Sequence, residues 1–361
     1  MDIFKTYNEY LAKLYLKYLL IIIGIFSSLT FVLNILEEIK FFNELNMGLY
    51  YPFLFTFLNL PSILFEIFPF IVLISTQLFF IHLYSKDEIL LLKNYGVKNT
   101  DIIKNISLVT LVFGIFLIFG FHSLSSNLKH NYLSFKNNFT TDKKYLAVIN
   151  ENGLWIRDEN KKTVSIINAE KIENNYLKDV SISQMDNKYR LIKTLIADRV
   201  DISNKNWIIK KAKVFEIDGK NFEKDNIVFE SNFDIKKINS LFSNLSSLNI
   251  FQLRSHYYDY KSLGYSTLEI ESQFNKLISL PVYLVIMILI ASILMLNNKF
   301  NKSKIFSIII GVLLSVIVYY INYFFNIMGI NERLSIMMSI WFPLLILALV
   351  SFIGLVKINE K

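Results

Sequence analysis

The sequence predicts an α-helical membrane protein with six transmembrane helices, three before and three after an inserted all-β domain. Two observations predict this fold class. Of the 361 residues, 53% are hydrophobic, and they gather in six nearly uncharged runs. A polar stretch of about 150 residues with the alternating pattern of β-strands separates the third run from the fourth. The expected parts are residues 1–126 with helices one to three, residues 127–270 with a β jelly roll, and residues 271–361 with helices four to six.

Each apolar run is long enough to cross a membrane, because a helix of about 20 residues spans the ~30 Å hydrocarbon core. The runs are Leu14–Leu36, Ile63–Leu83, Ile106–Ser126, Leu277–Leu296, Ile305–Phe325 and Ser335–Val356. The first run is too long for the apolar part of a secretory signal, and no small-residue cleavage site follows it. We therefore expect it to remain as a membrane helix.

The charges between the runs predict the orientation. Lysines collect after the second run and between the fourth and fifth runs, at Lys86, Lys93, Lys98, Lys104, Lys299, Lys302 and Lys304. The segment after the first run is acidic, with Glu37, Glu38, Lys40 and Glu44. Because positive loops face the cytoplasm, we expect both lysine-bearing termini on the cytoplasmic side and the β-domain on the opposite side.

Within the insertion, residues 192–202 and 207–217 alternate with period two, as expected of antiparallel strands with one dry face. The residues expected on dry faces are Ile192, Ile196, Val200 and Ile202, and Trp207, Ile209, Phe215 and Ile217. Turn-forming residues occur at 186–188, 203–206 and 218–219. A jelly roll or sandwich of about eight to ten strands fits this length. The chain has no cysteine, so this core must hold without disulfides.

An elbow at residues 85–96 separates the second and third runs. Ser85 and Glu88 match the S-x-x-E pattern of a capping box, and Asp87 suits the positive end of a helix dipole. Gly96 suits a left-handed helix stop. We therefore predict a short helix that is capped at both ends.

Two further expectations concern the neighbours of this short helix. Asn99 or Thr100 is expected to cap the helix that leads into the third run. The apolar residues 89–92 cannot all face lipid. Either some of them dock on another protein, or the helix lies on the lipid headgroups.

Few residues suggest site chemistry. Glu66 is an acid inside the second run, bracketed by Pro61 and Pro69, which are expected to break or kink that helix. The four histidines, His82, His122, His130 and His256, have no paired spacing, so we expect no metal site. The sequence contains no P-loop, no nucleophile elbow and no nucleic-acid-binding pattern. We therefore expect no catalytic site in this chain.

Several stretches resemble the YjgP/YjgQ permease family, which comprises the LptF and LptG subunits of the lipopolysaccharide exporter. The matching stretches are Pro61 with Phe68-Pro69, the elbow at 85–96, Asn152–Asp158 with its G-L-W-x-[KR]-D pattern, Phe274–Leu277 through Pro281, and Trp341-Phe342-Pro343. They occur in the family's order and cover nearly the whole chain. The Gly153, Leu154 and Trp155 stretch is more similar to LptG than to LptF.

The resemblance implies a permease subunit in a bacterial inner membrane, with the β-domain in the periplasm. Its implied partners are an ATPase dimer of LptB type, a sister permease of LptF type, bridge proteins of LptC and LptA type, and lipopolysaccharide. The ATPase would bind ATP and Mg²⁺, and this chain would bind no cofactor. Two such subunits would enclose a cavity that opens sideways to the outer leaflet.

The resemblance also assigns roles to residues. The ATPase-coupling helix would use Ser85, Asp87, Glu88, Ile89, Leu91, Leu92 and Gly96. At the position where LptG members often carry a cation for lipid phosphate, this sequence has Asn34. The other candidates for lipid contact are Lys40, Glu66, Lys129, His130 and Lys136.

Two alternatives stay open. The chain is also compatible with an LptF-type subunit of the same complex. From a different class, a stand-alone membrane enzyme or sensor would use the β-domain to bind a ligand and would have no ATPase partner.

Overall fold

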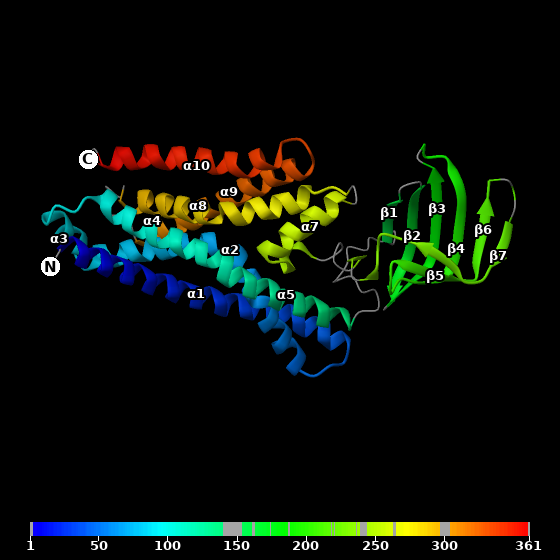
Figure 1. Ribbon diagram of the computed structural model, residues 1–361. Helices are drawn as coiled ribbons and strands as arrows, with labels where there is room; N and C mark the ends of the chain where they lie inside the picture. Colours follow the sequence, from blue (N-terminus) through cyan, green and yellow to red (C-terminus); the bar gives the residue numbers. More distant parts are fainter. Residues whose placement is uncertain are drawn as a thin grey trace. The chain divides into compact units, whose positions relative to one another are not determined.

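The computed structural model describes residues 3–139, 154–296 and 304–359, apart from positions 161–162, 174, 187, 218, 220, 236, 239–243 and 263–264. The chain forms two compact units, which are described separately. The helical unit comprises Met1–Lys129 and Leu268–Lys361, and the β-unit comprises His130–Thr267. Figure 1 shows the helices and strands of both units.

Six long apolar helices confirm the predicted membrane spans. Their bounds are α1 Ile3–Glu44, α2 Tyr50–Ser85, α4 Asn99–Phe116 with the π-helical segment η1 Leu117–Phe121 and α5 His122–Asn137, α8 Leu268–Leu296, α9 Lys304–Ile330 and α10 Ile336–Asn359. The short helix α3, Glu88–Asn94, lies between α2 and α4. In Figure 1, α3 lies beside the N-terminal end of α1, so the elbow and the start of the chain share one end of the helical unit.

The helix α1 extends further than its apolar run. The acidic segment after the first run, which we expected to be a loop, is helical instead, because Glu37, Glu38, Lys40 and Glu44 all belong to the last turns of α1. Glu38 is almost completely buried. The side chains buried along α1 recur at helical spacing, namely Leu11, Leu14, Tyr15, Leu19, Ile22, Thr30, Asn34, Glu38 and Phe42. Between Leu11 and Glu38 this stripe changes from apolar near the elbow to polar toward the other end, while the described residues around it are half-buried or exposed.

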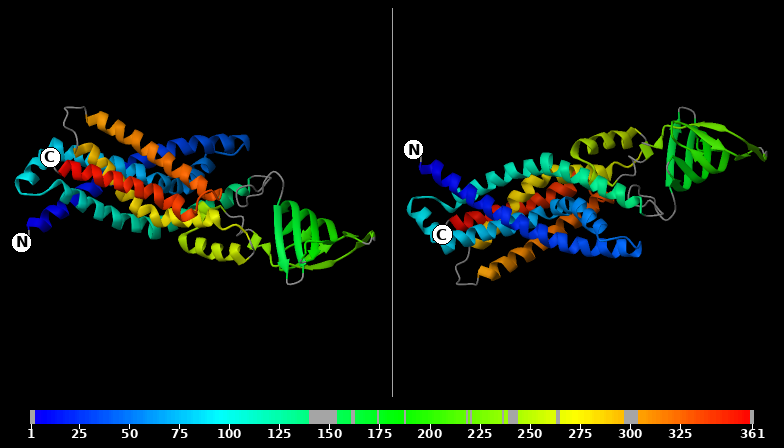
Figure 2. Two further views of the ribbon diagram at one scale, coloured as in Figure 1. Left: turned by 90° about the horizontal axis from the view of Figure 1, so that it is seen from above. Right: turned by 90° about the horizontal axis from the view of Figure 1, so that it is seen from below.

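Helix α2 is continuous. Of the break or kink predicted at Pro61 and Pro69, the break does not occur, since both prolines lie inside the helix. Close helix packing uses small residues, as is common in membrane bundles. Gly114 of α4 faces Pro281 of α8, and a Cβ atom added at Gly114 would lie 2.9 Å from the Cα atom of Pro281. The long helices run nearly alongside one another in both views of Figure 2.

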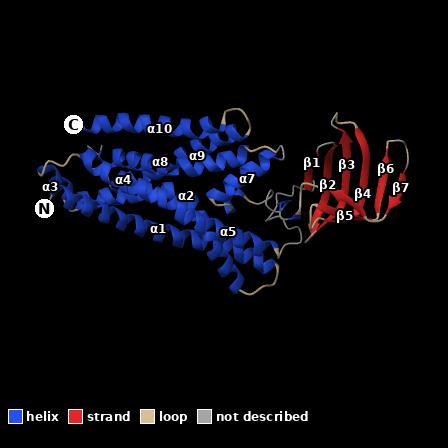
Figure 3. Cartoon of the chain, viewed as in Figure 1, coloured by secondary structure: helices blue, strands red, loops and turns tan. Residues whose placement is uncertain are grey.

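The β-unit contains an antiparallel sheet of eight strands in the described residues, which confirms the inserted β-domain. The strands are β1 Leu154–Asn160, β2 Thr163–Glu173, β3 Tyr176–Asp186, β4 Leu191–Asp201, β5 Asn206–Lys210, β6 Ala212–Glu216, β7 Asn221–Lys224 and β8 Ile227–Glu230. Strands β1 to β4 form a meander, and the sheet then divides at β4. One half of β4 pairs with β5, which pairs with β8, while the other half pairs with β6, which pairs with β7. Figure 3 distinguishes this all-strand region from the helices.

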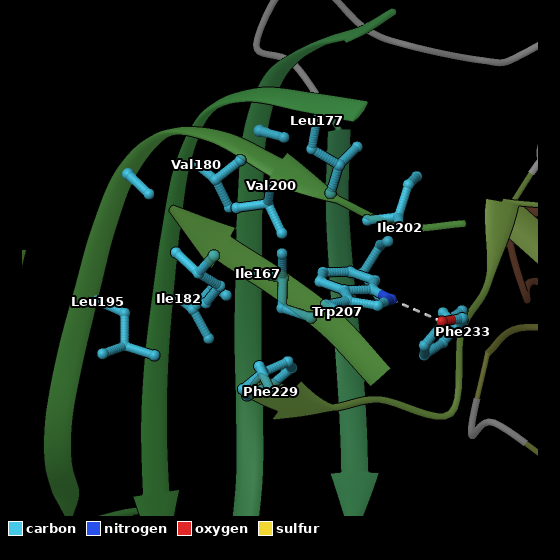
Figure 4. Close-up of a cluster of buried hydrophobic side chains, with 14 of the residues drawn as sticks. Ile167, Leu177, Val180, Ile182, Leu195, Val200, Ile202, Trp207, Phe229 and Phe233 are labelled. Carbon is cyan, nitrogen blue, oxygen red and sulfur yellow. Dashed lines mark hydrogen bonds between the residues drawn. The ribbon is translucent and has the colours of Figure 1, made fainter. Parts of the chain in front are cut away.

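The core of the β-unit lies inside the curved sheet. Across the meander, Leu154 pairs with Ala169, Ala169 with Val180, and Val180 with Ala197, and all four are buried. Figure 4 shows Trp207 at the centre of this cluster, where its indole Nε1 donates a 2.7 Å hydrogen bond to the carbonyl oxygen of Phe233.

The predicted dry faces are partly wrong. Val200, Ile202, Trp207 and Ile209 are buried as expected, whereas Ile192, Ile196, Phe215 and Ile217 are exposed. In β4 the buried positions change from odd to even between Ala197 and Val200, opposite Asp179, whose φ is 49°.

Between β5 and β6 the same change occurs at Lys211, whose φ is 52°. After this residue the buried side chains are Ala212 and Val214. Each irregular residue shifts the alternation by one position, and a shift of one moves every later side chain to the other face of the sheet.

The β-unit also contains a helix that the sequence reasoning did not predict, α7, Ile250–Ser262. Its first turn is capped by Asn249, whose Oδ1 accepts the backbone N–H groups of Phe251 and Gln252. Gln252 in turn accepts the N–H of Asn249 at 2.9 Å. This reciprocal pattern is a capping box, a signal that was present in the sequence.

Candidate functional site

The elbow ends at Gly96, as predicted. Gly96 has φ +81°, and its N–H donates to the carbonyl of Lys93 at 2.9 Å. The N–H of Val97 donates to the carbonyl of Leu92 at 3.0 Å. These two bonds form a Schellman motif, which satisfies the last carbonyls of α3 and fixes the direction of the chain into α4.

The predicted capping box at the other end of α3 is wrong. Ser85 is the last residue of α2, and its hydroxyl donates to the carbonyl of His82 at 2.9 Å. Helix α3 begins only at Glu88, and the residue before it, Asp87, has φ 54° and makes no side-chain cap bond. Because α2 continues through Ser85, this serine lies too early in the chain to cap α3.

The cap of α4 also differs from the prediction. Asn99 is already the first residue of the helix, and Lys98 occupies the cap position. The carboxylate of Asp101 accepts the backbone N–H of Lys98 at 3.0 Å. The capping group is therefore the third helical residue, instead of Asn99 or Thr100.

The carboxylate of Glu88 is engaged by two other helices. Its Oε2 accepts a 2.7 Å hydrogen bond from the hydroxyl of Tyr10 in α1. Its Oε1 lies 3.8 Å from Nε2 of His82 in α2, and Nδ1 of that imidazole lies 2.9 Å from the hydroxyl of Tyr18. A histidine tautomer with hydrogen on Nε2 satisfies both neighbours, because Tyr18 then donates to Nδ1. The Glu88 side chain is 24% exposed, so part of it stays accessible.

The apolar residues of α3 divide between two directions. Ile89 is buried against its own chain, and Leu92 is half-buried. Leu90 is 60% exposed and Leu91 is 55% exposed, and Tyr95 next to them is more exposed still. Together Leu90, Leu91 and Tyr95 form an apolar surface, which we call the elbow face. One side of α3 is thus packed against its own chain, and the other side is exposed.

A second polar cluster lies at the opposite end of α1. Asn34 is buried, and its Oδ1 accepts a 3.3 Å hydrogen bond from Nδ2 of Asn59 in α2. The Oδ1 of Asn59 accepts a 2.5 Å hydrogen bond from Nζ of Lys129 in α5. Asn59 therefore links two of the predicted lipid-contact residues, and we call these three side chains the asparagine–lysine chain.

The remaining predicted lipid-contact residues differ in burial and in their partners. Glu66 is within electrostatic range of Lys129 and of Lys276 in α8. Lys40 and His130 are exposed. Lys136 is buried, and its Nζ donates to the hydroxyl of Tyr132 at 2.7 Å.

The β-domain signature is only partly described. Gly153 lies outside the described residues. Leu154 begins β1 and belongs to the core, whereas Trp155 is 57% exposed. The two side chains alternate between the faces of the sheet, as expected for adjacent residues in a strand.

The sequence reasoning missed Tyr10, Asn59 and Lys276. Asn59 lies just before the second run between two leucines, and a polar residue among apolar neighbours was the available signal, since such groups in a membrane helix usually face protein or water. Tyr10 lies just before the first run, and nothing in the sequence pairs it with Glu88. Within the described residues, no three His, Asp or Glu side chains come close enough to hold a metal ion.

The fold defines a class: a multi-pass membrane protein whose six spans are interrupted by a β-domain. A comparison with protein families matches residues 9–357 to the lipopolysaccharide export system permease LptF/LptG. The chain belongs to this family, and it is therefore a multi-pass inner-membrane permease of lipopolysaccharide export, a component of an ABC exporter that includes a partner permease and an ATPase. A comparison with individually curated proteins finds no match.

Proposed function

We propose that this chain is the LptG-type subunit of an ATP-driven exporter that takes lipopolysaccharide from the outer leaflet of the inner membrane. In this proposal the termini and the elbow face the cytoplasm, and the β-unit faces the periplasm and passes lipid to bridge proteins of LptC and LptA type. The ATPase of LptB type docks on the elbow face. The loop lysines and the positive-inside rule support this orientation.

The observation that carries the proposal is the division of α3. Ile89 is buried and Glu88 is hydrogen-bonded to α1, whereas Leu90 and Leu91 stay exposed at the end of the membrane helices. A helix attached on one side and apolar on the other can receive a partner protein and pass its movement inward.

Copurification of an ATPase with the tagged chain tests the docking. Leu91→Glu places a charge on the elbow face, and we expect the ATPase to be lost while the sister permease stays bound. Leu49→Glu is the matched control, because Leu49 is 63% exposed at the other end of α2. An undiminished ATPase with Leu91→Glu would contradict docking at this face. No ATPase with the unaltered chain would also contradict docking at the elbow face.

We further propose that the lysines beside Glu66 contact lipid phosphates. Lys129 reaches the asparagine–lysine chain, and Lys276 approaches Glu66 from α8. The ammonium groups of Lys129 and Lys276 supply the positive charge that is absent at Asn34. Lys129→Gln and Lys276→Gln should each weaken binding of lipopolysaccharide to the purified complex, whereas Lys357→Gln, near the opposite end of the helices, should not. Equal binding by all three variants would overturn this assignment.

The exposed apolar side chains of the β-unit support a path for acyl chains over the sheet. Ile192 and Ile196 of β4 lie on one face, and Phe215 of β6 pairs with Thr194 between them. A photoreactive residue at Phe215 should crosslink to lipopolysaccharide only when ATP is supplied. A photoreactive residue at Trp155 tests the assignment to LptG instead of LptF. We expect the yield of its crosslink to the bridge protein to differ clearly between an LptG-type and an LptF-type subunit.

A further inference from the structure

Helix α1 connects the two polar clusters of the helical unit. Near one end, Tyr10 donates its hydrogen bond to Glu88 of the elbow. At the other end, Asn34 accepts the hydrogen bond from Asn59. The two residues are 24 positions apart, which corresponds to about 36 Å along a helix.

Side-chain hydrogen bonds attach α1 to every element around the elbow. Tyr10 is bonded to α3 and Tyr18 to His82 of α2. In α4, Asn105 donates to both oxygens of Asn8, at 3.1 Å to the backbone carbonyl and 2.8 Å to the side chain.

A further hydrogen bond between α1 and α4 is fully buried. Thr110 of α4 donates to the hydroxyl of Tyr15 at 2.9 Å. Leu11 and Leu19 are buried on the same side of α1. When the elbow moves, this part of α1 must therefore move with it, because otherwise buried contacts would break.

Among the three helices that meet at the elbow, α1 is the most regular. Helix α2 contains Pro61 and Pro69, and the span that begins with α4 contains the π-helical segment η1. Prolines and π-segments are the usual places where helices bend. Helix α1 has neither over Ile3–Glu44, and it runs unbroken in both views of Figure 2.

We propose that Tyr10 is a positioning residue that joins the Glu88 carboxylate to α1, so that α1 carries movement of the elbow to the asparagine–lysine chain. This inference rests on the proposed function, because it concerns how ATPase movement reaches the lipid site. Two of the three helices at the elbow contain prolines or a π-helical segment and α1 contains neither, so α1 transmits the displacement over the greatest length.

The test uses the complete transporter with its ATPase in lipid nanodiscs. Tyr10→Phe removes one hydroxyl and keeps the ring. We expect the lipopolysaccharide released per ATP hydrolysed to fall about fivefold to tenfold, the size of an ordinary hydrogen bond, because this bond lies at an exposed position. Tyr50→Phe is the matched control, because Tyr50 is exposed at the opposite end of α2.

A second measurement separates positioning from a loss of stability. The chain has no cysteine, so Leu36→Cys in α1 and Met338→Cys in α10 are its only sites for spin labels, and both positions are exposed. In the unaltered background the distance between the labels should change when the ATPase is trapped with nucleotide. With Tyr10→Phe it should keep its nucleotide-free distribution, although the complex still assembles.

The possible outcomes distinguish this inference from the proposed function. Tyr10→Phe and Glu88→Ala should be non-additive, since each removes the same hydrogen bond. A normal transport ratio and a normal distance change with Tyr10→Phe, or additive losses in the double variant, would overturn the inference alone. Failure of the unaltered protein to release lipid with ATP would instead count against the proposed function.

Discussion

The side chain of Gln77 in α2 lies directly against the backbone of Gly311 in α9. Its Nε2 donates a 2.7 Å hydrogen bond to the carbonyl oxygen of Ser307, one turn before the glycine. A methyl group at position 311 would overlap the Gln77 amide. The two helices therefore approach each other only because residue 311 has no side chain.

Gly311→Ala should destabilise the helical unit by about 1–3 kcal/mol, the usual cost of forcing a side chain into a packed site. The apparent melting temperature of the detergent-solubilised protein measures this. Gln77→Ala opens space for the new methyl group, so the double variant should be more stable than Gly311→Ala alone. A double variant that is equally unstable would mean that the amide is not the obstacle.

The carboxylate of Asp158 closes the sheet of the β-unit. It is buried in β1 and accepts hydrogen bonds from the Ser231 hydroxyl at 2.7 Å and from the backbone and side-chain nitrogens of Asn232 at 3.1 and 2.8 Å. Asp158→Asn replaces one acceptor oxygen with a donor that faces other donors. We expect a loss of about 1–3 kcal/mol in local stability, since buried groups would be left unsatisfied.

Amide hydrogen exchange measures this effect within the full chain. Protection should fall for β1 and for the residues around Ser231, because the carboxylate joins these two segments. Asp198→Asn is the control, since Asp198 is exposed on β4. Equal protection in Asp158→Asn and the unaltered protein would show that the carboxylate does not hold the ends of the sheet together.

The sequence predicts the six spans and the β-insertion because both depend on composition and period, which are local. It predicts the helix stop at Gly96 for the same reason, since the left-handed conformation favours glycine. The faces of the strands were predicted correctly on only one side of each irregular residue, after it in β4 and before it between β5 and β6. Asp179 and Lys211 have positive φ although neither is glycine, so their residue types did not predict the change of the buried face.

The candidate sites were less predictable, because they depend on contacts between distant positions. Glu88 was recognised from its place in the elbow, but its partner Tyr10 is 78 residues away. Asn34 was singled out as a missing cation, whereas Asn59 and Lys129 complete its environment from two other helices. Such pairs follow from helix packing and not from spacing along the chain.

The pKa of His256 predicts a pH dependence in α7. Burial lowers the pKa of this imidazole below its ordinary value of 6.5, and the charge of Asp259 partly opposes the shift. Below that ordinary value an unfolded histidine binds a proton that the folded one does not, so stability falls as the pH decreases through this range. We expect exchange protection in α7, corrected for intrinsic rates, to be lower at pH 5.5 than at pH 7.5.

His256→Gln removes the titrating group, so its protection should be nearly the same at both pH values. Asp259→Asn removes the opposing charge and should strengthen the pH dependence, because the neutral imidazole is then favoured further. A variant at position 256 that keeps the full pH dependence of the unaltered protein would assign the effect to another group.

The left-handed conformation of Gly96 predicts a cost for any other residue there. Gly96 has φ +81° and no atom within 4 Å of an added Cβ, so Gly96→Ala tests backbone strain without a clash. The expected cost is about 1–2 kcal/mol. Gly48→Ala is the matched control, because it too has open space around the Cβ position and lacks a positive φ.

Because the strain acts on the Schellman motif, its effect should concentrate in α3. Exchange protection should decrease for residues 92–97 with Gly96→Ala and stay unchanged there with Gly48→Ala. In the transporter, Gly96→Ala should also reduce the amount of ATPase that copurifies, since the elbow face then depends on a frayed helix. Reduced exchange protection together with full ATPase binding would show that the ATPase binds the elbow face without an ordered C-terminal end of α3.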